Sequence, residues 1–188
     1  MARVLIDIDD VLYPFIDQLR QYLFDNLVLP LEAMPEPTCW EFADQWGITA
    51  EDLWAIADEA VNFGLFRVGD PLPGAAEGLR ELRSLGHTIH IATARFGGQP
   101  GVLQRDTVHW LNEHGFPYDS LTFTADKALL RCDYAIDDRV KNYRAMDAAG
   151  IHAVLMDRPW NQDDMYNNRR VTDIPEFVAL IKTAEAAR

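Results

Sequence analysis

The sequence has no long uncharged apolar run, and none of its hydrophobic stretches approaches the ~20 residues of a transmembrane span. It is also short of basic residues, with 17 lysines and arginines against 30 aspartates and glutamates and a formal net charge of −13. Membrane surfaces and nucleic acids are themselves negatively charged. The composition therefore argues against a membrane protein and against a binder of long nucleic acid.

Cysteine is scarce as well. Cys39 and Cys132 lie far apart in the sequence, without the spacing of a metal or redox motif, and no cluster of histidine and cysteine is present. We interpret both cysteines as reduced thiols. Because no signal segment precedes the first apolar run, we expect a cytoplasmic protein. With 188 residues, the chain has room for one domain, or for one domain with an insertion.

The first strand-like segment begins at Arg3, and its apolar residues 4–6 are followed by two aspartates, Asp7 and Asp9. Such a short β-branched run is typical of a buried strand, and side chains two positions apart on a strand share a face. Two ionised carboxylates at such a short distance repel each other, which costs free energy unless a cation or a proton lies between them. On its own, such a pair is more often a solvated strand end or a helix N-cap than a catalytic site.

Three later apolar runs also end in polar residues, and each is followed by a helical pattern. Such a β-α-β-α order predicts a parallel sheet, in which ligand sites lie beyond the carboxyl ends of the strands. A fifth strand is predicted at 151–156 and a closing helix at 174–187. The polar residues expected to converge at one edge of the sheet are Asp7, Asp9, Thr93, Lys127, Asp137 and Asp138.

The segment from residue 14 to residue 70 differs from the rest of the chain. Two helical stripes, at 15–23 and 53–61, are separated by prolines, and a Gly/Pro-rich stretch follows. This segment carries eleven acidic and two basic residues, five of the nine phenylalanines and three of the five tryptophans. We predict an inserted helical cap at 14–70 and a core built from 1–13 and 71–188, with a mobile polar loop at 162–170.

Taken in order, the motifs resemble those of the haloacid dehalogenase superfamily of phosphohydrolases. These motifs are Asp-x-Asp-x-Val, an apolar strand ending in threonine, a later lysine and an Asp-Asp pair. Residues 7–15 are similar to the Asp-Met-Asp-Gly-Val-Leu-Ala-Asp-Phe opening of the 5'(3')-deoxyribonucleotidases. Residues 155–161 resemble the Phe-Asp-x-Pro-Tyr-Asn segment of the same branch. The resemblance implies an α/β fold, a Rossmann-like parallel sheet with a small α-helical cap, and phosphatase activity on nucleoside monophosphates, with deoxyribonucleotides favoured.

Two departures from that branch concern the site. Asp10 stands where the branch has glycine, which adds a carboxylate. Ala94 and Arg95 replace its Ser-Pro after the phosphate-binding threonine, which removes a hydroxyl donor and adds a cation.

Phosphate-ester cleavage needs a nucleophile, a proton donor for the leaving oxygen and neutralisation of charge. We assign Asp7 as the nucleophile that forms an aspartyl-phosphate, and Asp9 as the general acid and then the base. Asp7, the backbone carbonyl of Asp9 (which the resemblance implies) and Asp137 are expected to bind Mg²⁺. Asp138 is an alternative or outer ligand. Oxygen ligands beside a phosphate suit Mg²⁺ better than zinc.

The remaining assignments concern the substrate. Thr93 and the backbone N–H groups around Ala94 are expected to hold the phosphoryl oxygens, with Lys127 and Arg95 as cations. The resemblance implies that Phe15 stacks on the base. Weaker candidates for substrate contact are Trp40, Phe42, Phe63, Phe66, Arg158, Trp160 and Asn161.

Three alternatives stay open at this stage: a phosphatase of sugar phosphates, a phosphatase of polynucleotide ends, and a nucleotide-binding module without turnover. The intact Asp7/Asp9 pair argues against the last. The assembly is also open, and a homodimer is one candidate.

Overall fold

The protein was analysed as a computed structural model that describes residues 1–162 and 169–187. Its centre is a six-stranded parallel sheet in the order β3-β2-β1-β4-β5-β6. The strands are β1 (Arg3–Ile6), β2 (Thr88–Thr93), β3 (Ser120–Phe123), β4 (Tyr134–Asp137), β5 (His152–Met156) and β6 (Arg170–Val171). The predicted parallel sheet is confirmed. The two-residue β6 was not predicted, because it is too short to show a periodic pattern, and most of the loop predicted at 162–170 lies outside the described residues.

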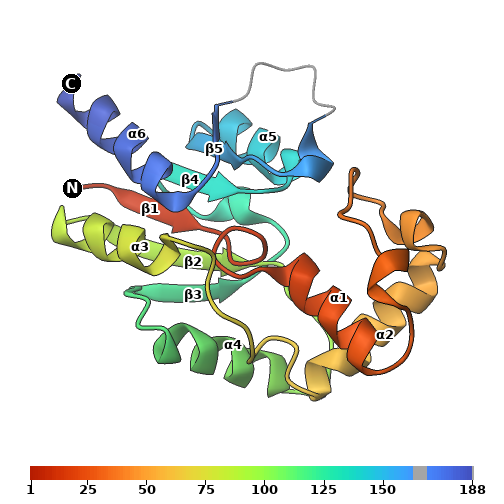
Figure 1. The fold of residues 1–188 in the computed structure, drawn as a ribbon. Helices are drawn as coiled ribbons and strands as arrows, with labels where there is room; N and C mark the ends of the chain where they lie inside the picture. Colours follow the sequence, from red (N-terminus) through yellow and green to blue (C-terminus); the bar gives the residue numbers. More distant parts are fainter. Residues whose placement is uncertain (163–168, 188) are drawn as a thin grey trace.

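Helices cover both faces of the sheet (Figure 1). Val4 and Ile6 of β1 pack in the larger cluster, with α3 (Ala75–Ser84), α4 (Val102–Glu113) and α6 (Ile174–Ala186). Leu5, between them in the chain, packs on the other face with residues of α5 (Val140–Ala148). A strand covered on both faces has no need for polar alternation, which explains the continuous apolar run at residues 4–6.

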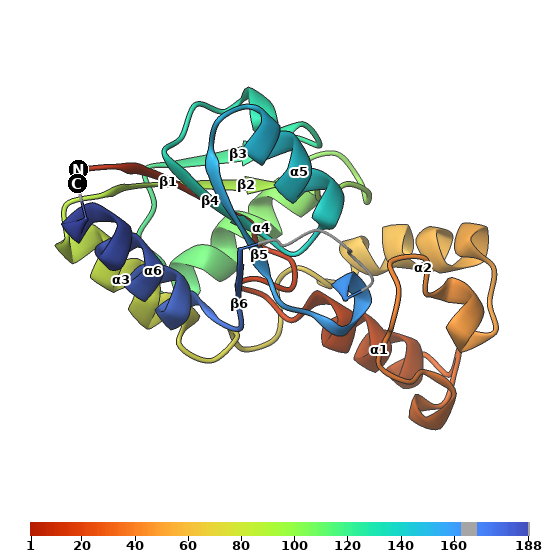
Figure 2. The same cartoon turned by 90° about the horizontal axis from the view of Figure 1, so that it is seen from above.

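The cap consists of α1 (Phe15–Asp25), α2 (Ala50–Asn62) and the short 3₁₀ turns η1 (Leu31–Ala33) and η2 (Ala43–Trp46). Leu19, Leu23, Trp46 and Leu53 form the centre of a small hydrophobic core of its own. Figures 1 and 2 show α1 and α2 beyond one end of the sheet, while the start of β1 and the end of α6 lie toward the opposite end. The helices fall inside the segment 14–70 that we predicted as a cap, and they stand next to the carboxyl ends of the strands.

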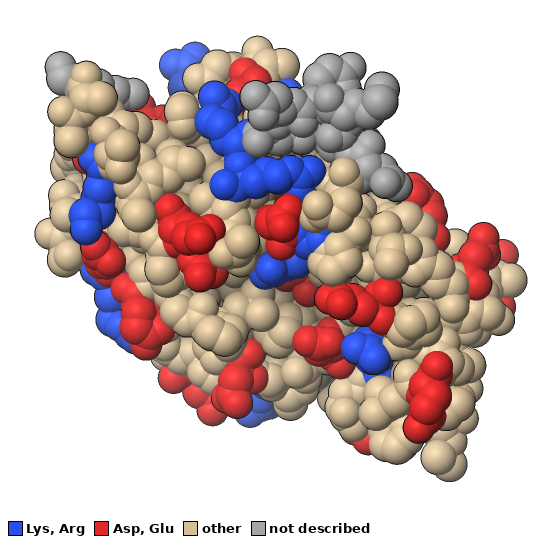
Figure 3. All heavy atoms as spheres, turned by 45° about the horizontal axis from the view of Figure 1, so that its top comes forward, with Lys and Arg blue, Asp and Glu red and all other residues tan. Residues whose placement is uncertain are grey.

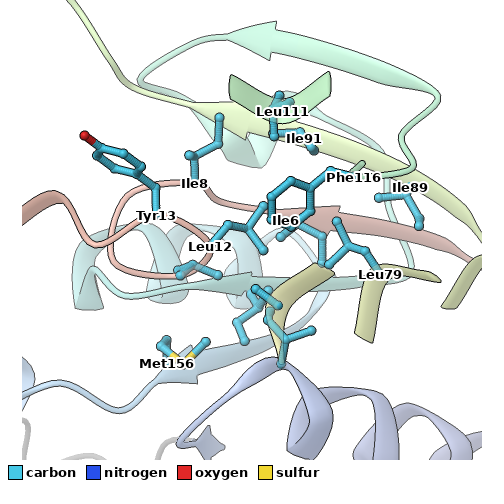
Figure 4. Packing of buried hydrophobic residues seen from close by; sticks show 14 of the residues in the cluster. Ile6, Ile8, Leu12, Tyr13, Leu79, Ile89, Ile91, Leu111, Phe116 and Met156 are labelled. Atoms are coloured by element: carbon cyan, nitrogen blue, oxygen red, sulfur yellow. The ribbon is translucent and has the colours of Figure 1, made fainter. Parts of the chain in front are cut away.

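Buried aromatic side chains join the cap to the core. Tyr13, at the exit from the first motif, meets Trp110 of α4 edge to face with ring centroids 5.2 Å apart. The Tyr13 hydroxyl donates to the carbonyl of Leu65, and the Trp110 indole donates to the carbonyl of Gly69 at 2.8 Å. Figure 4 shows Tyr13 beside the main hydrophobic cluster. Both chain connections of the cap are thereby fixed to the core.

The closing helix predicted at 174–187 is α6, which ends one residue earlier, at Ala186. Beyond the sheet and cap, two further 3₁₀ turns, η3 (Lys127–Leu129) and η4 (Pro159–Asn161), follow β3 and β5. In the described part of the chain, no helix combines the length and the apolar character needed to cross a bilayer.

The contact between α3 and α6 generates a test of the fold. A Cβ placed on Gly78 would lie 2.4 Å from Cγ2 of Ile174. Gly78→Ala should therefore lower the free energy of unfolding by about 1–3 kcal/mol, the usual cost of overpacking, although alanine favours a helix. Urea unfolding followed by circular dichroism measures this.

The matching control is a double-mutant cycle with Ile174→Ala, which removes the opposing methyl group. Gly78→Ala should cost less in that background than in the parent protein. Equal costs in the two backgrounds would contradict the proposed packing.

Candidate active site

Four of the predicted site residues lie at the carboxyl ends of neighbouring strands. Asp7 follows β1, Thr93 ends β2, and Asp137 ends β4, with Asp138 directly after it. All four side chains are buried, which is unusual for aspartate unless it is paired or binds a cation. The parallel register of β2, β1 and β4 places these strand ends at one edge.

Lys127, in η3 after β3, lies between two of these carboxylates. Its Nζ is 2.6 Å from Oδ1 of Asp7 and 2.6 Å from Oδ2 of Asp137. Burial by itself would lower the pKa of Lys127, but the charges and hydrogen bonds of Asp137 and Asp7 raise the pKa above its usual value. Lys127 is therefore held as a cation against the predicted nucleophile.

Asp137 and Asp138 have different surroundings. Both Asp137 oxygens accept from the Asn142 amide at 3.0 Å, Oδ1 also accepts from the Arg139 N–H at 2.9 Å, and Oδ2 accepts from Lys127. Asp138 accepts from the Trp160 indole at 2.9 Å through Oδ2 and lines the cavity. Asp137 is thus committed to protein donors, while Asp138 still presents carboxylate oxygen to the cavity.

The acidic residues of this edge fit a divalent cation. One carboxylate oxygen each from Asp7, Asp137 and Asp138 lies within 4.8 Å of the others. Burial, and in addition the neighbouring carboxylates, raise the pKa values of Asp7 and Asp138 well above the usual range. A hard cation that accepts oxygen ligands would relieve this repulsion. The Asp9 side chain does not belong to this cluster.

Asp9 is instead paired with Arg95. The Arg95 Nε lies 3.0 Å and 3.1 Å from the two Asp9 oxygens, and its NH2 group donates to Oδ1 at 2.8 Å. The third nitrogen, NH1, donates to the Thr107 hydroxyl at 3.1 Å. The Arg95 side chain is completely buried, while that of Asp9 is 26% exposed. Arg95, the cation that this chain has in place of the proline of the related motif, therefore forms an ion pair with the predicted general acid, Asp9.

Asp10 occupies a left-handed backbone conformation with φ of 55°. Glycine adopts this conformation without strain, which explains the glycine in the related motif, and aspartate is among the few other residues that tolerate it. The Asp10 carboxylate is buried and accepts from the Ile16 N–H in the first turn of α1 at 3.3 Å. Burial and the neighbouring Asp9 raise its pKa. Asp10 thus ties the first motif to the cap.

The turn that we predicted to bind phosphate follows β2. The Thr93 side chain is buried, and its hydroxyl accepts from the Arg95 N–H at 3.2 Å. Ala94 lines the cavity. The threonine therefore fixes the turn that brings the Ala94 backbone to the site.

A cavity of about 360 Å³ lies between the cap and the strand ends. Phe15 stacks on Phe66, with ring centroids 6.1 Å apart and planes 25° apart, and both rings line the cavity. Trp40, Phe42 and Trp160, which were weaker candidates, also line it. Phe63, another such candidate, is 71% exposed and lies outside the lining.

Two other candidates have structural contacts. Arg158 donates through Nε to the carbonyl of Asp10 at 2.8 Å, and Asn161 is buried with its amide on the carbonyls of Asp138 and Met156. Sequence reasoning missed Trp54, Phe96 and Asn142 in the cavity wall. Trp54 and Phe96 come from the cap and the core, and no motif marks either one.

The comparison with known proteins agrees with this geometry. Residues 1–187 match the protein family described as 5' nucleotidase, deoxy (pyrimidine), cytosolic type C. A protein of Chlorobaculum tepidum provisionally named a 5'(3')-deoxyribonucleotidase is 28% identical over 164 residues, which cover 84% of this chain and 79% of the relative. A Bacillus cereus protein provisionally named a nucleotidase is 29% identical over 189 residues, which cover 94% and 96%.

Two solved structures illustrate the fold. A haloacid dehalogenase-like hydrolase of Streptococcus pneumoniae has a TM-score of 0.63 at 18% identity and covers 96% of this chain and 98% of its own. A Bacillus subtilis hydrolase solved with bound magnesium has a TM-score of 0.64 at 12% identity, with coverage of 96% and 99%. The family, fold and hydrolase class implied by the motifs are thereby confirmed: the chain belongs to the deoxy (pyrimidine), cytosolic type C family of 5' nucleotidases, haloacid dehalogenase-like enzymes that hydrolyse phosphoric monoesters.

Proposed function

We propose that this enzyme is a Mg²⁺-dependent phosphatase of nucleoside monophosphates, with deoxyribonucleotides favoured, and that it works through an aspartyl-phosphate on Asp7. The observation that carries the proposal is the placement of Asp7. It is buried against Lys127 and beside Asp138, at the floor of a cavity whose wall includes seven aromatic side chains. A phosphate fits at the charged floor, and a planar base fits against the rings.

The reaction has two halves. First, a carboxylate oxygen of Asp7 bonds to phosphorus, the ester P–O bond breaks, and protonated Asp9 gives its proton to the leaving oxygen. Next, Asp9 takes a proton from water, whose oxygen bonds to phosphorus, and the bond from phosphorus to Asp7 breaks. Inorganic phosphate leaves and Asp7 is restored. Lys127 and the backbone around Ala94 stabilise the phosphoryl oxygens throughout.

The structure leads us to revise one metal assignment. Asp137 is saturated by Lys127, Asn142 and the Arg139 N–H, so we propose that it fixes the lysine. The Mg²⁺ ligands would then be the Asp7 and Asp138 carboxylates, with the backbone carbonyl of Asp9. Bound there, Mg²⁺ would neutralise the acidic edge and the phosphate.

The cap favours a small substrate. The segment 14–70 contributes a charge of −9, and acidic side chains are spread over the cap at the right of Figure 3. A long polyanion would meet repulsion there, while a single phosphate is neutralised locally at the floor of the cavity. This supports mononucleotides over polynucleotide ends. Both cysteines are free, which fits the expected cytoplasmic location.

Replacement of the nucleophile is the direct test. Asp7→Asn keeps the shape but removes the attacking charge, so phosphate release from a nucleoside monophosphate should fall to background. Asp9→Asn should slow it by ~10²–10⁴-fold, the usual worth of proton transfer. Circular dichroism serves as the folding control. Phosphate release by Asp7→Asn at the parent rate would disprove the aspartyl-phosphate mechanism.

The metal proposal predicts that EDTA abolishes turnover and that added Mg²⁺ restores it, because the acidic edge then regains its counter-charge. Ca²⁺ should compete without supporting turnover, since its longer bonds misplace Asp7. The measurement is the Mg²⁺ concentration that gives the half-maximal rate, compared between the variants Asp138→Asn and Asp137→Asn.

Loss of Asp138, a direct ligand, should raise the half-maximal Mg²⁺ concentration by more than the roughly 10–100-fold typical of an outer partner. Asp137→Asn should raise it less and mainly reduce kcat, because Lys127 loses its anchor. A larger rise for Asp137→Asn than for Asp138→Asn would indicate that Asp137 is the direct metal ligand. Turnover in the presence of EDTA would show that the mechanism needs no metal.

Phe15 tests the nature of the substrate. Phe15→Ala should weaken kcat/KM for a nucleoside monophosphate by the equivalent of ~1–3 kcal/mol, the worth of one base stack. Hydrolysis of ribose 5-phosphate, which has no base, should change little. Equal losses on both substrates would make Phe15 a packing residue and favour the sugar-phosphate alternative.

A further inference from the structure

Arg95 is a buried cation in the cavity lining, and each of its three guanidinium nitrogens has a hydrogen-bond partner. Four hydrogen bonds join its guanidinium to Asp9 and Thr107. Its two neighbouring rings are those of Tyr13 and Phe66, whose centroids lie 4.7 Å and 4.1 Å from the central guanidinium carbon. Such aromatic contacts favour a cation and restrict its rotation. Side chains from the core and from the cap segment therefore restrict the position of the guanidinium.

These contacts do not suit direct binding of the substrate phosphate. Nε and NH2 already face Asp9, and NH1 has Thr107 as its partner. The positive charge is balanced by the Asp9 carboxylate. We expected Arg95 to bind substrate, and the structure gives its guanidinium to the proton-transfer group instead.

The contacts of Asp9 also indicate that Arg95 orients its carboxylate. Within residues 1–162 and 169–187, no side chain other than Arg95 donates a hydrogen bond to the Asp9 carboxylate, which is otherwise partly exposed. An exposed aspartate would rotate among several rotamers, whereas a guanidinium that contacts both oxygens fixes the carboxylate plane. Lysine, a point charge with rotatable donors, would not give the same orientation.

We propose that Arg95 is a positioning residue that holds the Asp9 carboxylate in the orientation needed for proton transfer to the leaving group. The proposal rests on the phosphatase mechanism above. In the step concerned, the bond from Asp7 to phosphorus forms, the ester P–O bond breaks, and the Asp9 proton moves to the departing oxygen. A misplaced Asp9 leaves the nucleophile and the phosphate site intact but deprives the alkoxide of its proton.

The dependence of the rate on the leaving group isolates this effect. A nucleoside or sugar leaves as a basic alkoxide and needs the proton, while p-nitrophenolate leaves without one. The quantity to compare is kcat/KM, because it reports the steps up to departure of the alcohol and is insensitive to the later hydrolysis of the phosphoenzyme.

The experiment measures kcat/KM of the parent enzyme, Arg95→Met and Arg95→Lys on a nucleoside monophosphate, ribose 5-phosphate and p-nitrophenyl phosphate. Both variants should lose about 10²-fold on the two alkyl esters, the usual effect of a 1 Å misplacement, and several-fold less on the aryl ester. Arg80→Met, which removes an exposed arginine paired with Glu77, is the matched control and should leave all three values unchanged.

Two further measurements separate the alternatives. If Arg95 bound the phosphate itself, the variants would raise the inhibition constant of inorganic phosphate and lose equally on all three esters. That result, or unchanged rates, would overturn the proposal. Thr107→Val removes one partner of the guanidinium and should reproduce the leaving-group pattern at smaller amplitude, which keeps the test valid if Arg95→Met does not fold. Failure of the parent enzyme to hydrolyse any of the esters would instead overturn the proposed function.

Discussion

The ion pairs of Lys127 with Asp7 and Asp137 are the interaction on which the site depends. They join the ends of β1 and β4 to the turn after β3, so that three segments distant in the sequence share one charged centre. Burial of carboxylates in this number would be prohibitive without a cation among them. The lysine offsets only part of the charge, since Asp138 adds a third buried carboxylate. The remaining deficit explains why this edge suits a divalent cation.

A packed group of aromatic side chains holds the cap next to the charged edge of the sheet. Tyr13 and Trp110 fix the two chain connections, and Phe66 carries the contact onward to Phe15 and to Arg95. Phe15, which lines the proposed base site, therefore packs on Phe66, and Phe66 also contacts Arg95, the partner of Asp9.

Much of the fold could be predicted from the chain. The apolar runs, the Gly and Pro punctuation and the helical stripes fixed five strands and the helices that follow them, because local periodicity reflects which faces are buried. The two-residue β6 could not be found in this way, since it exists only by pairing with β5. The acidic motifs also had to converge, because strands in a parallel sheet end at the same edge.

The sequence by itself determined the family, the parallel sheet and the set of residues at its carboxyl edge. Only the tertiary structure decided how those residues divide their work. Adjacent aspartates look alike in the chain, yet Asn142 and Lys127 saturate Asp137 while Asp138 faces the cavity. Likewise, a motif cannot show that Arg95 turns toward Asp9, because the rings and the Thr107 hydroxyl that fix its guanidinium come from other segments. Residue type is local information, whereas hydrogen-bond partners and exposure are set by distant parts of the chain.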